Sequence, residues 1–201
     1  MITVLLAEDQ VMVREALAAL LSLEGDLDVV AQVSRGDEVV TAARAARPDV
    51  ALLDIEMPGQ DGLATAAALA RDVPTCRVVI LTTYARPGYL RRAMDAGVRG
   101  FLVKDGPAAE LAKSIRRVMA GERVVDPGLA VAALAEGNSP LTTREQEVVR
   151  AVGHQPTVAD IAAALHLSAG TVRNHLSAAM IKLGARNRAE ALRIAQEKGW
   201  L

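Results

Sequence analysis

The sequence predicts an α/β domain with a doubly wound parallel sheet, followed by a smaller all-α domain. Apolar runs alternate with segments of helical periodicity through the first 120 residues. Glycine and proline then crowd the stretch from Gly121 to Pro140, and no strand pattern follows Pro140. These observations favour two domains, residues 1–121 and 140–201, joined by a linker over 122–139 that has room for a short helix.

Five strand–helix units are expected in the first domain. They are Ile2–Ala7 with Val11–Leu23, Val29–Val33 with Glu38–Ala46, Val50–Asp54 with Leu63–Asp72, Val78–Thr82 with Leu90–Ala96, and Gly100–Val103 with Ala108–Met119. Because the strand runs are apolar at consecutive positions, helices must cover both faces of the sheet. The expected strand order is 2-1-3-4-5, as in flavodoxin-like folds.

Four helices are expected in the second domain: Thr143–Val152, Val158–Leu165, Ala169–Leu183 and Arg188–Glu197. Thr143 and Gln146 have the spacing of a capping box, and Thr157 and Ser168 precede their helices as N-caps. The short connection between the second and third helices predicts a helix-turn-helix.

Composition narrows the class of protein. Among 201 residues, 51% are hydrophobic and 23% are charged, which is typical of a globular protein. A single cysteine excludes an internal disulfide, and no signal peptide or membrane-spanning run is evident, so we expect a cytoplasmic protein without membrane insertion. The net charge of −1 hides a basic end, because residues 140–201 carry eight Lys+Arg against five Asp+Glu.

Three carboxylates end two of the predicted strands. Glu8 and Asp9 follow the first strand, and Asp54 ends the third. In the predicted strand order these two strands are neighbours, so the acids should meet beyond the carboxyl edge of the sheet. Because close carboxylates repel one another, a hard divalent cation is expected there, and Mg²⁺ suits such ligands.

Thr82 and Lys104 end the fourth and fifth strands at the same edge. A hydroxyl, an ammonium and a cation around Asp54 would neutralise the oxygens of an aspartyl phosphate. Each residue alone has an ordinary structural explanation, such as a helix cap, a strand position or a solvated charge. Their joint placement at successive strand ends favours one shared site.

The helix-turn-helix would place the start of Ala169–Leu183 in a DNA major groove. Arg173, Asn174 and Ser177 lie near one face of this helix and suit base edges. Residues expected at phosphates are Thr157, Thr171, Lys182, Arg186 and Arg188, and Ser168 is a further expected DNA contact. The ordinary alternative is a solvated basic surface.

The acidic motif, with Asp54 followed by Met57-Pro58-Gly59 and Gly62, resembles the receiver domain of two-component response regulators. The resemblance implies that Asp54 is the phosphoacceptor, with Thr82 and Lys104 contacting the phosphoryl group. It also implies a switch in which Thr82 and Phe101 shift together. The implied Mg²⁺ ligands are Glu8, Asp9, Asp54 and the backbone carbonyl of Glu56.

The second domain resembles the LuxR-type four-helix domain of the NarL group, through Leu141–Val148, Gly170–His175 and Lys182–Arg188. The resemblance implies phosphorylation by a sensor histidine kinase, homodimerisation, binding to a double-stranded DNA operator, and RNA polymerase as a further partner. Asp54–Gly59 and Glu197–Leu201 are also similar to regulators of membrane fluidity that control fatty-acid desaturase genes.

Two other classes of function compete with a phosphorylation-switched regulator. The acidic pocket could serve Mg²⁺-dependent phosphatase chemistry with Asp54 as nucleophile, although no substrate-binding insertion is evident. Alternatively, the chain could bind DNA independently of phosphorylation, with the first domain acting as a dimerisation module.

Overall fold

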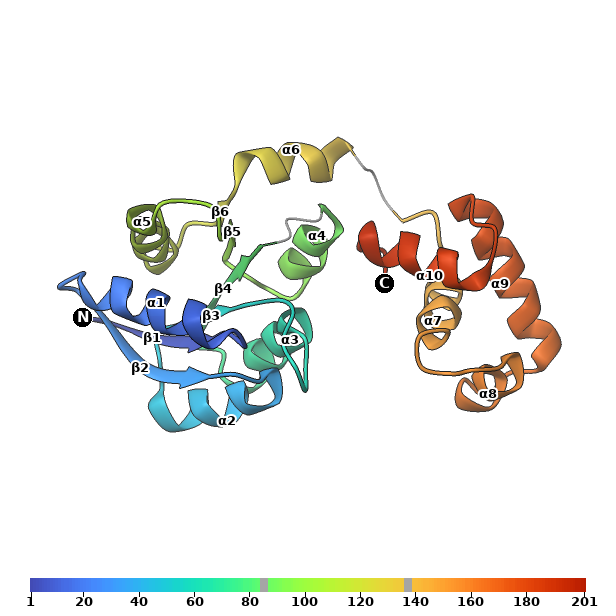
Figure 1. Ribbon diagram of the computed structural model, residues 1–201, viewed down its shortest axis with the longest axis horizontal. Helices are drawn as coiled ribbons and strands as arrows, with labels where there is room; N and C mark the ends of the chain where they lie inside the picture. Colours follow the sequence, from blue (N-terminus) through green and yellow to red (C-terminus); the bar gives the residue numbers. More distant parts are fainter. Residues whose placement is uncertain (84–86, 136–138) are drawn as a thin grey trace. The chain divides into compact units, whose positions relative to one another are not determined.

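The computed structural model describes residues 1–83, 87–135 and 139–201, which fold as two compact units (Figure 1). The first unit contains the sheet and extends to Val131, and the second consists mainly of Ala132–Leu201. Each has its own hydrophobic core. In the described part of the chain, no helix combines the length and the apolar character needed to cross a bilayer.

The sheet of the first unit has six parallel strands in the order β2-β1-β3-β4-β5-β6. The strands are β1 (Ile2–Ala7), β2 (Leu27–Val33), β3 (Val50–Leu53), β4 (Arg77–Thr82), β5 (Gly100–Val103) and β6 (Val124–Val125). The predicted doubly wound order is therefore confirmed, with β6 added at the edge beside β5. Strand β6 lies inside the predicted linker and has two residues, which is too short for a periodic pattern.

The helices of the first unit are α1 (Val11–Ser22), α2 (Gly36–Ala46), α3 (Gly62–Asp72), α4 (Pro87–Asp95) and α5 (Ala108–Met119), and its boundary at Val131 falls within α6 (Pro127–Ala135). Buried side chains of α1 and α5, including Leu21 and Ile115, form one core with Val4, Leu6 and Leu52 of the sheet. Helices α2 and α3 pack on the opposite face (Figure 1). Covering both faces explains why the strands are apolar at consecutive positions.

The second unit consists of α7 (Thr143–Ala151), α8 (Val158–Ala164), α9 (Ala169–Leu183) and α10 (Arg188–Glu197). Its core includes Val148, Ile161, Val172 and Leu176. Between α8 and α9, His166 adopts a left-handed conformation with φ of 53°, which makes the tight turn of the helix-turn-helix.

The predicted capping box at Thr143 and Gln146 is wrong by one residue. The Thr142 hydroxyl accepts a hydrogen bond from the Glu145 amide, and the Glu145 carboxylate accepts one from the Thr142 amide. The negative charge of the Glu145 carboxylate is also stabilised by the positive end of the helix dipole, whereas a neutral Gln amide would gain much less. Thr157 and Ser168 cap α8 and α9 through their side chains.

Candidate functional site

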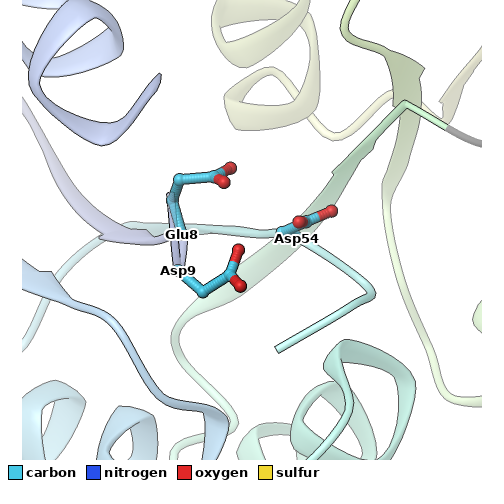
Figure 2. Close-up of side chains that lie close together, drawn as sticks. All are labelled: Glu8, Asp9 and Asp54. Carbon is cyan, nitrogen blue, oxygen red and sulfur yellow. The ribbon is translucent and has the colours of Figure 1, made fainter. Parts of the chain in front are cut away.

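The three predicted carboxylates lie together at the carboxyl edge of the sheet (Figure 2). Strands β1 and β3 are paired in parallel with Ala7 opposite Leu53, so the residues that follow these strands are neighbours. The Asp54 amide donates to the Ala7 carbonyl at 2.9 Å, which continues the strand pairing by one residue. One carboxylate oxygen from each of Glu8, Asp9 and Asp54 lies within 4.8 Å of the others.

Lys104 is the positive charge of this pocket. Its Nζ lies 2.6 Å from Glu8 Oε2 and 3.1 Å from Asp54 Oδ2, and its side chain is only 9% exposed. Burial raises the pKa of the Glu8 carboxyl above its ordinary value, although the hydrogen bond from Lys104 opposes this effect. Three carboxylates against one ammonium leave two formal negative charges, which a divalent cation would neutralise.

Asp54 is held in one orientation by its own loop. Its Oδ1 accepts a hydrogen bond from the Ile55 amide at 2.8 Å, which leaves Oδ2 toward Lys104. Gly62 closes the loop against the Asp54 carbonyl, because a Cβ there would lie 2.0 Å from that oxygen. Glu56 lies in this loop with an exposed position, and its carbonyl as a metal ligand stays a prediction.

Thr82 and Phe101 lie on the same face of the sheet. Thr82 of β4 is opposite Val103 of β5, and Phe101 is two residues earlier on β5. Both side chains are buried, and the Lys104 amide donates to the Thr82 carbonyl at 2.9 Å. This backbone contact ties the ends of β4 and β5 together beside Asp54. The coupled shift of Thr82 and Phe101 stays a prediction.

Mg²⁺ is expected to raise the melting temperature of the full chain, because the ion would relieve repulsion that exists only in the folded pocket. Binding at about 100 times Kd corresponds to about 2.7 kcal/mol of stabilisation. Calorimetry in MgCl₂ against NaCl of equal ionic strength measures the effect. Asp9→Asn should shrink the Mg²⁺-dependent shift, and an equal shift in that variant would contradict the assignment.

All three side chains that were predicted to read bases are exposed on the second unit. Arg173, Asn174 and Ser177 are exposed on α9 and have no side-chain partner in the part of the chain that the structure describes. Val172 and Leu176 of the same helix are buried in the core. The fold therefore orients α9 with its polar face outward.

Other predicted DNA contacts have partners within the second unit. Lys182 Nζ lies 2.6 and 2.8 Å from the two carboxylate oxygens of buried Glu145, and Arg188 donates to the Pro156 carbonyl at 2.7 Å. Arg186 pairs with Glu190, the hydroxyls of Thr157 and Ser168 cap α8 and α9, and the Thr171 hydroxyl shares a hydrogen bond with the Ser168 hydroxyl. The role of these residues at phosphates stays a prediction.

Sequence reasoning missed two residues of this unit. No local sequence pattern predicts the ion pair of Glu145, because its partner Lys182 is 37 residues away in the chain. Ile181 is exposed on α9. The sequence could have predicted this position, since Ile181 follows Ser177 by four residues and thus lies on the same helix face.

A receiver fold with an acidic pocket, joined to a helix-turn-helix unit, defines a DNA-binding response regulator. Residues 4–116 match the family described as the response regulator receiver domain, and residues 139–195 match the luxR family of bacterial regulatory proteins. The chain belongs to the response regulators with a LuxR-type DNA-binding domain, and it is a regulator of transcription. This family is one of transcriptional regulators rather than of classical enzymes.

Two relatives from Bacillus subtilis resemble the chain over its whole length. The transcriptional regulatory protein DesR is 46% identical over 200 residues, which cover 100% of this chain and 99% of DesR. The transcriptional regulatory protein YvfU is also 46% identical, with 100% of both chains covered. The crystal structure of the response regulator ChrA, from a heme-sensing two-component system, is 32% identical with a TM-score of 0.59, covering 100% of this chain and 98% of ChrA.

Proposed function

We propose that Asp54 accepts a phosphoryl group from a sensor histidine kinase and that this event switches dimerisation and operator binding. The observation that carries the proposal is the buried Asp54 carboxylate, which is 6% exposed and lies beside Lys104 in a pocket of three acids. A buried carboxylate that is paired with a lysine in a pocket is typical of a reactive group, whereas an ordinary surface carboxylate is solvated.

In the proposed transfer, a carboxylate oxygen of Asp54 attacks phosphorus as the bond from phosphorus to the kinase's histidine nitrogen breaks. The leaving imidazole keeps the bonding electron pair and takes up a proton. The Ile55 amide holds the carboxylate in place, and the Lys104 ammonium neutralises charge on the phosphoryl oxygens. Mg²⁺, held by Glu8, Asp9, Asp54 and the Glu56 carbonyl, would supply further neutralising charge.

The switch is proposed to start from competition for Lys104. Its ammonium holds Glu8 and Asp54 together, so a phosphoryl group on Asp54 would draw it into a new set of contacts. The backbone hydrogen bond from Lys104 to Thr82 would transmit the movement of Lys104 to the ends of β4 and β5, where Thr82 and Phe101 are buried.

Self-association is proposed through the face formed by α1 and α5. Apolar side chains of α1 and of its C-cap residue are exposed despite their cost in water: Val11, Met12, Leu20 and Leu23. Beside them, a cavity of about 520 Å³ is lined by residues that include Leu17 and Leu20 of α1 and Leu111 of α5. A second copy would cover these groups.

Joining two DNA-binding units would raise their effective concentration at paired half-sites of an operator. RNA polymerase as a further partner follows from the role in transcription. Control of desaturase genes remains a proposal from the sequence resemblance, because DesR and YvfU are equally identical to this chain.

Operator binding tests the proposed function. Duplex DNA is selected from a random pool with the phosphorylated full chain, and its affinity is measured by fluorescence anisotropy with and without acetyl phosphate. We expect at least tenfold tighter binding after phosphorylation of the wild type and no change for Asp54→Ala. Equal affinities in all four samples would instead support DNA binding independent of phosphorylation.

A further inference from the structure

Ile181 is an unusual residue on the outward face of α9. Its side chain is 81% exposed, although isoleucine stabilises proteins mainly when it is buried. Its neighbours on this face, Arg173, Asn174 and Ser177, are polar and exposed. The face therefore ends in one apolar group after a polar stretch.

Helical geometry places Ile181 within the base-reading face rather than beside it. At about 100° per residue, Arg173, Ser177, Ile181 and Asn174 fall within an arc of about 100°. The buried residues Val172, Leu176 and Ala179 lie on the opposite side of the helix. Ile181 is therefore directed the same way as the residues that are proposed to read DNA.

We propose that Ile181 is a specificity-determining residue that contacts the methyl group of a thymine in the operator. This inference rests on the proposed DNA binding of α9. The thymine methyl is the apolar group that bases present in the major groove, and apolar side chains recognise it by contact. Isoleucine is β-branched and stiff at χ1, so it offers this methyl a fixed surface at little entropic cost.

Ile181 and Arg173 lie at different heights along α9, so they would contact different base pairs of the half-site. Eight residues separate Ile181 from Arg173, which is a rise of about 12 Å. Because the major groove runs obliquely to the DNA axis, the thymine would lie at most about three to four base pairs from the base that Arg173 reads. Arg173 and Ile181 thus read different positions of one half-site.

A protein partner fits this surface less well than DNA does. Stable protein interfaces have a desolvated apolar centre of many residues. Ile181 is the one large apolar side chain that is exposed on α9, and Lys182 beside it is charged. The exposed side chains of Arg173, Asn174 and Ser177, which have no partner among the residues that the structure describes, complement the polar edges of bases.

Replacing thymine by deoxyuridine, which removes only the methyl group, tests the proposal. Each thymine of the selected operator is replaced in turn, and the affinity is measured for wild type, Ile181→Ala and Ile181→Val. For the wild type we expect about fourfold weaker binding at one thymine of each half-site, the effect of one buried methyl. Ile181→Val should keep this loss, and Ile181→Ala should bind the thymine operator more weakly and show no loss with deoxyuridine.

A matched control removes exposed apolar surface from the first unit, which does not contain α9. Val30→Ala, on β2, should give the same deoxyuridine profile as the wild type. A specific operator whose profile is unchanged by Ile181→Ala would overturn the role of Ile181 while leaving DNA binding intact. Failure of the wild type to select any operator would overturn the proposed function itself, and the role of Ile181 with it. Loss of dimerisation in Ile181→Ala, with an unchanged profile, would assign Ile181 to a protein contact.

Discussion

Asp54→Asn is expected to abolish phosphoryl transfer and, with it, phosphorylation-dependent dimerisation. An amide nitrogen replaces one carboxylate oxygen, and the neutral amide is a poor nucleophile that cannot form a stable acyl phosphate. The full chain is incubated with Mg²⁺ and acetyl phosphate, and intact mass and light scattering are followed together. The wild type should gain one phosphoryl adduct and become dimeric, whereas the variant should gain neither.

Two controls separate chemistry from folding. Asp61→Asn makes the same chemical change in the same loop, and it should be phosphorylated normally because Asn also caps a helix well. Met12→Asp places a charge on the exposed face of α1, where the native side chain is 83% exposed. It should gain the adduct yet remain monomeric. An adduct on the Asp54→Asn protein would place the phosphoacceptor elsewhere.

Glu145→Gln is expected to destabilise the second unit by about 2 kcal/mol. The change removes a buried carboxylate that accepts two hydrogen bonds from Lys182 and one from the Thr142 amide. Breaking a fully buried pair costs about 3–5 kcal/mol, and the value is smaller here because Lys182 is 35% exposed. For a unit of this size, the melting temperature should fall by about 8–16 °C.

The only tryptophan, Trp200, reports unfolding of the second unit within the full chain. Glu197→Gln removes a carboxylate from an exposed ion pair with Arg193, and it should lower the melting temperature much less. Equal losses in the two variants would show that burial of Glu145 contributes nothing.

The stability that Glu145 contributes is expected to depend on pH. Burial alone would raise the pKa of Glu145, but hydrogen bonds from Lys182 and Thr142 outweigh burial and lower it below 4.5. A lowered pKa in the folded state means that the carboxylate contributes stability above about pH 4.5 and that this contribution is lost as pH falls through the folded-state value. The difference between wild type and Glu145→Gln should therefore be full at pH 7 and shrink in acid.

Lys182→Met distinguishes a structural role from a phosphate contact. If the ammonium serves Glu145, the variant lowers the melting temperature and leaves the salt dependence of operator binding unchanged. A phosphate contact would instead reduce the slope of log K against log salt by about one.

The sequence by itself determined the two domains, the parallel sheet and the convergence of Glu8, Asp9 and Asp54. This was possible because strands apolar at consecutive positions require helices on both faces, and a parallel sheet brings its carboxyl ends to one edge. Lys104 could be assigned to the pocket for the same reason.

The tertiary structure alone decided which charges are paired and which side chains face outward. Strand β6 exists because β5 supplies its hydrogen-bond partners, and Lys182 meets Glu145 because α9 packs against α7. The exposure of Ile181 follows from the rotation of α9, which is fixed by burial of Val172 and Leu176 in the core. Local patterns record periodicity, whereas these features depend on contacts between residues far apart in the chain, which no local pattern contains.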